Sequence, residues 1–202
     1  MFLKLYLKKI TKLENHMKKI IIIILGLLIT IVTYTTIENS RIQDKFGILK
    51  DACRAKPVIN AHPYVNKTGL HPVMSVIKSS TGFTIYTYAT PDDVLAKSIE
   101  DTELVLCLNE AKKVLINSCA YTTKKEGRIV TNIVERYRFE QKVLLVEAKT
   151  AKVLAQNILK GEEPRKCLKQ ELFIAGKDTN EVTGKHISDS QIGEWMRPYT
   201  NI

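Results

Sequence analysis

Cysteine is the residue type in this chain that most invites a chemical interpretation. Cys53, Cys107, Cys119 and Cys167 form no C-x-x-C pair, and no histidine lies at zinc-ligand spacing from Cys107 or Cys119. An even number of cysteines beyond a hydrophobic segment predicts disulfides, with unpaired structural thiols and a metal site as alternatives. Three connectivities are open. We favour Cys107 with Cys119, joined within one strand-turn-strand unit, which leaves Cys53 for Cys167.

Histidine supplies the next candidates. His62-Pro63 and His71-Pro72 are close enough in the chain to meet, and His186 is far from both. A Cys/His or Ser-based nucleophile would be assembled only in the fold, so spacing does not exclude one. No local catalytic signature surrounds these residues, and we favour turn histidines beside proline. We predict no catalytic residue, cofactor site or metal ligand.

Two short matches suggest a penicillin-recognising serine enzyme. Residues 75–78 read S-x-x-K and residues 67–69 read K-T-G. In those enzymes the serine opens a helix and K-T-G comes later, whereas here the order is reversed and Ser75 lies in a β-type run. We interpret both matches as coincidence, as we do the glycosylation sequon at Asn66.

A charge-free segment, residues 20–37, follows Lys18-Lys19 and precedes Glu38. A membrane-spanning helix needs about 17–25 mainly apolar residues, so we favour a transmembrane anchor. A cleaved signal peptide is the alternative, in which case the protein is secreted, and a buried core helix is the third. The lysines before the segment predict a cytoplasmic amino terminus and an external carboxyl-terminal domain. Translation could start at Met1 or Met17.

The segment divides the chain into four parts. We predict a cytoplasmic basic flank (residues 1–19), the anchor or signal (20–37), a tether (38–52) and a disulfide-bonded ectodomain (53–202). Half of the net charge of +10 lies in residues 1–37. The ectodomain is therefore only mildly basic, and we predict no nucleic-acid partner.

Alternating apolar and polar residues dominate the ectodomain and predict strands. The expected strands are residues 72–77, 82–88, 103–108, 114–121 and 153–159, with residues 128–148 too long for one strand and divided into two. Pro91 predicts a short helix through Ile99.

Ser188 and Gln191 form a capping box, and Ile187 with Ile192 forms a hydrophobic staple, so a terminal helix begins there. We expect Trp195 and Met196 to face the core and Pro198 to end the helix. The fold class is mainly β (α+β): an amino-terminal transmembrane or signal helix, then an antiparallel sheet covered by a carboxyl-terminal helix.

Several landmarks together resemble a group of uncharacterised bacterial envelope proteins with one amino-terminal hydrophobic segment and a Cys-containing β-rich ectodomain. The landmarks are Cys53, residues 61–64, 71–73, 103–107, 119–121, 147–155, 161–167 and 195–199. The resemblance implies the architecture and brings no activity. Its members tend to carry Thr-Gly in the turn where this chain has Thr150-Ala151, which puts a left-handed turn there in doubt.

These observations favour a membrane-anchored, extracytoplasmic binding or structural module. Its expected partners are the lipid bilayer, through residues 20–37, and an envelope protein or glycan. The alternative is an envelope hydrolase with a Cys/His or Ser-based site. A cleft that gathers His62, His71 and a carboxylate would favour the enzyme. An exposed apolar or tyrosine-rich patch around Tyr86 and Tyr88 would favour the binding module.

Overall fold

A computed structural model describes residues 2–65, 68–125, 127–173 and 177–201, while the side chains of residues 2–23 and of Lys125 lie outside the description. Asn66 and Lys67, which belong to the sequon and to the K-T-G match, and Glu126, in an expected turn, therefore lie outside it. The chain divides into two compact units, residues 1–44 and 45–202.

The first unit is the greater part of helix α1, Phe2–Phe46. Its apolar side chains from Ile24 to Ile37 are exposed by about half or more. Among the described residues, no helix combines the length and hydropathy needed to cross a bilayer. The side chains of Ile20–Ile23, the start of the predicted segment, are outside the description.

The expected tether is helical. α1 runs to Phe46 and is followed directly by a 3-10 helix, η1 (Gly47–Arg54). Phe46, Leu49 and Ala52 are buried at intervals of three residues, which places them on one face of a helix with three residues per turn. The second unit therefore begins with this buried helical turn rather than with a free linker.

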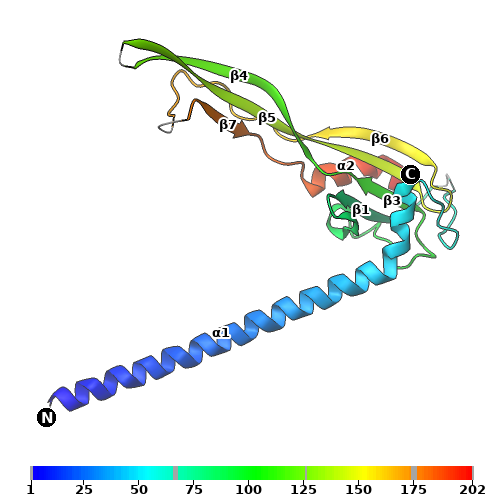
Figure 1. The fold of residues 1–202 in the computed structure, drawn as a ribbon. Helices are drawn as coiled ribbons and strands as arrows, with labels where there is room; N and C mark the ends of the chain where they lie inside the picture. Colours follow the sequence, from blue (N-terminus) through cyan, green and yellow to red (C-terminus); the bar gives the residue numbers. More distant parts are fainter. Residues whose placement is uncertain (1, 66–67, 126, 174–176, 202) are drawn as a thin grey trace. The chain divides into compact units, whose positions relative to one another are not determined.

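The second unit is built on a seven-stranded sheet (Figure 1). Its elements are β1 (Val73–Ser79), β2 (Gly82–Ile85), the 3-10 turn η2 (Thr87–Ala89), β3 (Leu104–Leu108), β4 (Lys112–Lys125), β5 (Arg128–Glu147), β6 (Val153–Lys160), β7 (Thr179–Thr183) and helix α2 (Asp189–Thr200). The mainly β class with a carboxyl-terminal helix is confirmed. Most of the strand pairs are antiparallel, as expected, but β1 pairs with β3, and β5 with β7, in parallel.

Strand β5 organises the sheet. It is one strand of 20 residues, so the expected division of residues 128–148 is wrong. β4 and β3 pair with successive stretches of it, as do β7 and β6. Partners along its whole length explain why a strand much longer than the usual 3–10 residues persists.

The core lies where α2 meets the carboxyl-terminal half of β5. Buried side chains from β1, β3, β5 and α2 form one cluster, with members such as Leu104, Leu145, Ile192 and Met196. The capping box is present: Gln191 N donates to Ser188 Oγ (3.2 Å), and Ser188 N donates to Gln191 Oε1 (2.9 Å). Trp195 is only partly buried against the cluster, whereas Met196 is fully buried.

Two local predictions are wrong because tertiary pairing intervenes. Residues 91–99 form turns and no helix, since Val73 N donates to Val94 O and Ala96 N to Val73 O, which draws this segment along β1. Pro198 lies inside α2 and the helix continues to Thr200. Thr200 is buried and its carbonyl accepts from His71 N (2.9 Å), so a tertiary contact holds the last turn.

Candidate functional site

The structure pairs all four cysteines, Cys53 with Cys107 and Cys119 with Cys167, at Cα–Cα distances of 5.6 and 5.8 Å. The favoured pairing of Cys107 with Cys119 is wrong. β3 and β4 do not pair with each other but follow one another along β5. The partners of these two cysteines on β5, Leu144 and Val134, are ten residues apart, which is about 33 Å along a strand and far beyond the reach of a disulfide. With both bonds formed, no cysteine thiol is available in the described chain for catalysis or metal binding.

The structure brings His62 and His71 to one carboxylate. His71 Nδ1 lies 2.6 Å from Glu103 Oε2, and His62 Nδ1 lies 3.5 Å from Glu103 Oε1. His71 is buried and its ring lies 4.8 Å from that of Tyr64, whereas the His62 side chain is about half exposed. Sequence spacing suggested that the histidines could meet, but it did not single out Glu103.

The backbone around this cluster has a structural role. His62 N donates to Thr102 O (3.0 Å), Glu103 N to Pro72 O (3.0 Å), and Ala148 N to Glu103 O (2.8 Å). The cluster thus joins the two histidine loops to the start of β3. Catalysis would further require a nucleophile or an activated water within reach of the imidazoles.

Ser75, the serine of the S-x-x-K match, is fully buried in β1. Its hydroxyl is hydrogen-bonded to that of Thr90, which is also buried. A serine in this position satisfies a polar group inside the core and is screened from any substrate, which agrees with the interpretation of the match as coincidence.

Of the two tyrosines, Tyr88 is exposed and borders a hollow, and Tyr86 beside it is partly buried. The Tyr88 side chain is 77% exposed and its ring centroid lies 5.6 Å from that of Tyr86. A hollow of about 310 Å³ lies between this turn and α2. Its lining comprises Tyr88, Ala89, Pro91, Asp189, Ser190, Gly193, Glu194 and Arg197.

Helix α2 supplies the polar side of the hollow. Asp189, Gly193 and Arg197 are spaced by four residues, and Ser190 and Glu194 follow the same spacing, so all five lie along one face of the helix. Gly193 brings the helix close to the turn, because a Cβ added there would lie 3.4 Å from Pro91 Cγ. The sequence predicted that Trp195 and Met196 of this helix face the core. It did not predict the neighbouring polar face, although the i, i+4 spacing of these residues can be read from the sequence.

Tyr86 and Asp189 connect this hollow to a second one. Tyr86 Oη donates to Asp189 Oδ1 at 3.1 Å. Partial burial, and then the negative charge of Asp189, raise the pKa of Tyr86 above its usual value of 10.0. Beyond this pair lies a hollow of about 320 Å³ whose lining includes Lys78, Glu110 and His186.

The two hollows have the properties of a binding surface. An exposed tyrosine ring offers a face for stacking and a hydroxyl for hydrogen bonding. The carboxylates of Asp189 and Glu194 accept hydrogen bonds, and the guanidinium of Arg197 donates them. The arrangement can recognise a partner that presents both an apolar face and polar groups. No protein-family model, curated protein or solved structure matches this chain.

Proposed function

We propose that this chain is a membrane-anchored, extracytoplasmic module that binds an envelope protein or glycan in the hollow beside Tyr88. The observation that carries the proposal is the Tyr88 ring, 77% exposed at the edge of a hollow lined by Asp189, Glu194 and Arg197. A large aromatic side chain left in water costs free energy that burial against a partner recovers.

The proposed anchor is residues 20–37 within α1. Threonines in this helix satisfy their hydroxyls on backbone carbonyls one turn earlier: Thr30 on Leu27 (2.8 Å) and Thr33 on Ile29 (2.9 Å). Hydroxyls bonded within the helix cost less in hydrocarbon than free ones. The two disulfides support an oxidising compartment outside the cytoplasm.

The test is site-specific photo-crosslinking of the full chain in intact cells. A photoreactive phenylalanine analogue replaces Tyr88, and the matched control carries it at Ile59, which is 78% exposed. We expect a discrete adduct from position 88 that Arg197→Glu abolishes. Peptides foreign to this chain in the digested adduct identify a protein partner, and loss of the added mass on glycosidase treatment identifies a glycan. Identical products from both positions, or no adduct from position 88, would contradict the proposal.

A second candidate is the envelope hydrolase, favoured by the gathering of His62, His71 and Glu103. If these residues are catalytic, His71→Gln should abolish a hydrolytic activity while leaving the unfolding midpoint nearly unchanged. If they are structural, the same change should lower the midpoint, because it removes a charge-assisted contact from a buried imidazole.

A further inference from the structure

The end of the β4–β5 hairpin extends beyond the core and forms an arm, which we define as residues 117–125 and 127–136 with residues 164–173 (Figure 1). None of the core cluster comes from these residues; its members on β5 are Val143 and Leu145. The arm is therefore stabilised outside the core cluster, by its own contacts and by the pairing of β7 with β5 over residues 133–137.

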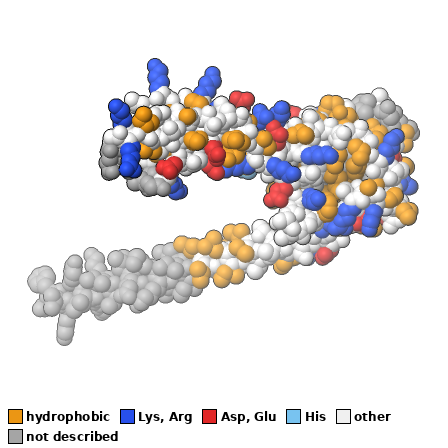
Figure 2. All heavy atoms as spheres, turned by 45° about the horizontal axis from the view of Figure 1, so that its top comes forward, with side chains coloured by type: hydrophobic (Ala, Val, Ile, Leu, Met, Phe, Trp, Pro, Cys, Tyr) orange, Lys and Arg blue, Asp and Glu red, His pale blue; other side chains and the backbone are white. Residues whose placement is uncertain are grey.

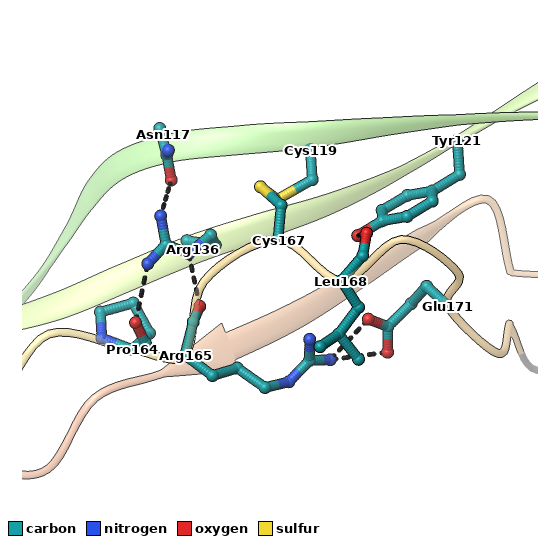
Figure 3. Close-up of a disulfide and its surroundings, with 9 residues drawn as sticks. All are labelled: Asn117, Cys119, Tyr121, Arg136, Pro164, Arg165, Cys167, Leu168 and Glu171. Atoms are coloured by element: carbon teal, nitrogen blue, oxygen red, sulfur yellow. Dashed lines mark hydrogen bonds and ion pairs between the residues drawn. A yellow bond between two sulfur atoms is a disulfide. The ribbon is translucent and has the colours of Figure 1, made fainter.

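Arg136 on β5 holds residues 164 and 165 against the hairpin (Figure 3). Only 8% of its surface is exposed, and its guanidinium donates to Pro164 O (2.7 Å), Arg165 O (2.7 Å) and Asn117 Oδ1 (2.8 Å). Each hydrogen bond satisfies a buried charge that would otherwise be costly. The segment that follows is thus positioned by a built-in polar contact.

The Cys119–Cys167 disulfide holds the next residues. Tyr121 on β4 adds a hydrogen bond from its hydroxyl to Leu168 O (3.0 Å; Figure 3). Its ring also packs edge-on against that of Phe173. These contacts attach residues 164–173 to β4, and side chains such as that of Leu168 remain exposed to solvent.

Several large aliphatic residues of the arm are exposed to solvent. The side chain of Leu172 is 92% exposed, that of Ile129 is 70% exposed and that of Leu168 is 50% exposed. A hollow of about 730 Å³ lies between residues 120–123 and 169–173, with Tyr121, Leu172 and Phe173 in its lining beside Lys169. Large aliphatic side chains held this far out of a core indicate a contact surface.

The same region is basic. Apart from the buried Arg136, the charged side chains that the structure describes there are Lys124, Arg128, Arg165, Lys166 and Lys169 against Glu135 and Glu171. Glu171 is bonded to Arg165 (2.6 Å), which neutralises one charge of each sign and leaves the excess of cations unchanged. Figure 2 shows basic side chains around the free end of the hairpin with apolar side chains between them.

From this combination we infer that the arm is a membrane-contact device that docks on an anionic bilayer surface. Cations favour the negative surface potential of anionic lipids, and exposed Leu and Ile gain by leaving water at the headgroup boundary. Nucleic acid or a soluble polyanion would use the cations but leave Leu172 and Ile129 in water. If α1 anchors the chain as proposed above, the arm is held near the bilayer and a weak contact is enough for docking. The residues of the arm are separate from those that line the hollow beside Tyr88.

The test uses the full chain in vesicles of phosphatidylcholine with or without phosphatidylglycerol. All native cysteines are in disulfides, so a single introduced cysteine takes a fluorophore selectively. Thr131→Cys places the fluorophore near the end of the arm, and Lys152→Cys places it in the exposed turn beyond the opposite end of β5. The readout is quenching by spin-labelled lipid, which is local and is not produced by attachment of α1 alone.

We expect quenching at position 131 in phosphatidylglycerol vesicles, weaker quenching in pure phosphatidylcholine, and loss at high salt. Lys124→Glu with Arg128→Glu should lower the ratio of docked to free arm roughly tenfold or more. Leu172→Ser should also reduce it, while Ile158→Ser, an exposed aliphatic change on β6, should not.

Three outcomes would overturn the inference. They are equal quenching in both vesicle types, equal quenching at positions 131 and 152, and a fluorophore response to duplex DNA that vesicles do not produce. If the arm does not dock on vesicles but position 88 gives a specific adduct, the proposed function still holds and only the membrane contact is refuted. If the arm docks but position 88 gives no adduct, the membrane contact holds and the proposed binding function is refuted.

Discussion

At the scale of single residues, Ala151 shows how a turn can form against the preference of its side chain. Its φ is +58°, in the left-handed region, and the turn is closed by Ala151 N donating to Glu147 O (2.8 Å). The doubt raised by the missing glycine is thus resolved: the left-handed turn forms with alanine. Pairing of β5 with β6 on both sides of the turn outweighs a local cost of about 1–2 kcal/mol.

Ala151→Gly should therefore stabilise the protein, by about 0.5–1 kcal/mol, because glycine adopts positive φ freely although it loses more entropy on folding. The measurement is the free energy of unfolding in urea. Ala155→Gly, inside β6, is the matched control and should destabilise, since a strand interior gains nothing from glycine. Equal effects at the two positions would refute the strain at Ala151.

Tyr86 predicts a pH dependence. Its pKa is raised in the folded state by burial and by Asp189, so the folded state favours the protonated phenol. The corresponding stability is fully present below about pH 10 and is lost as pH rises through the folded pKa. We expect the stability difference between the wild type and Tyr86→Phe to be constant from neutral pH to about pH 9 and to shrink above pH 10. A difference independent of pH would show that Tyr86 does not interact with Asp189.

At the scale of elements, α2 is both the cover of the core and one wall of the candidate site. Ser188→Ala should cost about 1 kcal/mol through the lost cap, and Met196→Ala about 2–5 kcal/mol because Met196 is fully buried. Glu194→Gln, on the exposed face of the same helix, should leave stability nearly unchanged. Chemical denaturation of the three variants separates these roles, and an unmoved midpoint for Met196→Ala would mean that α2 is not docked.

The two disulfides differ in access. The Cys119–Cys167 bond has one exposed partner, Cys167, whereas the Cys53–Cys107 bond joins a half-buried Cys53 to Cys107, which is only 3% exposed. Attack by a thiolate needs access to a sulfur, so mild reductant without denaturant should open Cys119–Cys167 first. Alkylation and peptide mapping would then label Cys119 and Cys167 while Cys53 and Cys107 stay protected. Loss of either bond should cost about 2–4 kcal/mol. Labelling of Cys53 first, or of any thiol before reduction, would contradict this assignment.

At the scale of the whole molecule, the proposed topology rests on the charges on either side of residues 20–37. A reporter that is active only outside the cytoplasm, fused after Ile202, should be active, and a cytoplasmic reporter should be silent. Reversing Lys18 and Lys19 to Glu should weaken this orientation. An active cytoplasmic reporter on the unaltered chain would refute the external placement and remove the compartment argument for the disulfides.

Local sequence by itself determined the features that depend on neighbouring residues. The capping box at Ser188 and Gln191, the β1–β2 hairpin, the return strand β6 and the mainly β class all follow from periodicity or from side chains within four positions. Met196 was likewise predictable as a core residue from its place on an amphipathic helix.

Only the tertiary structure decided which distant segments meet. The single β5 strand, the parallel pairs, the extended path of residues 94–96 along β1 and the partners of Cys107 and Cys119 depend on hydrogen bonds between remote backbones, and local periodicity carries no record of these. The convergence of His62 and His71 on Glu103 arises in the same way. The hollow beside Tyr88 exists because α2 packs one face on the core and turns the face of Asp189, Glu194 and Arg197 toward the turn that carries the tyrosine.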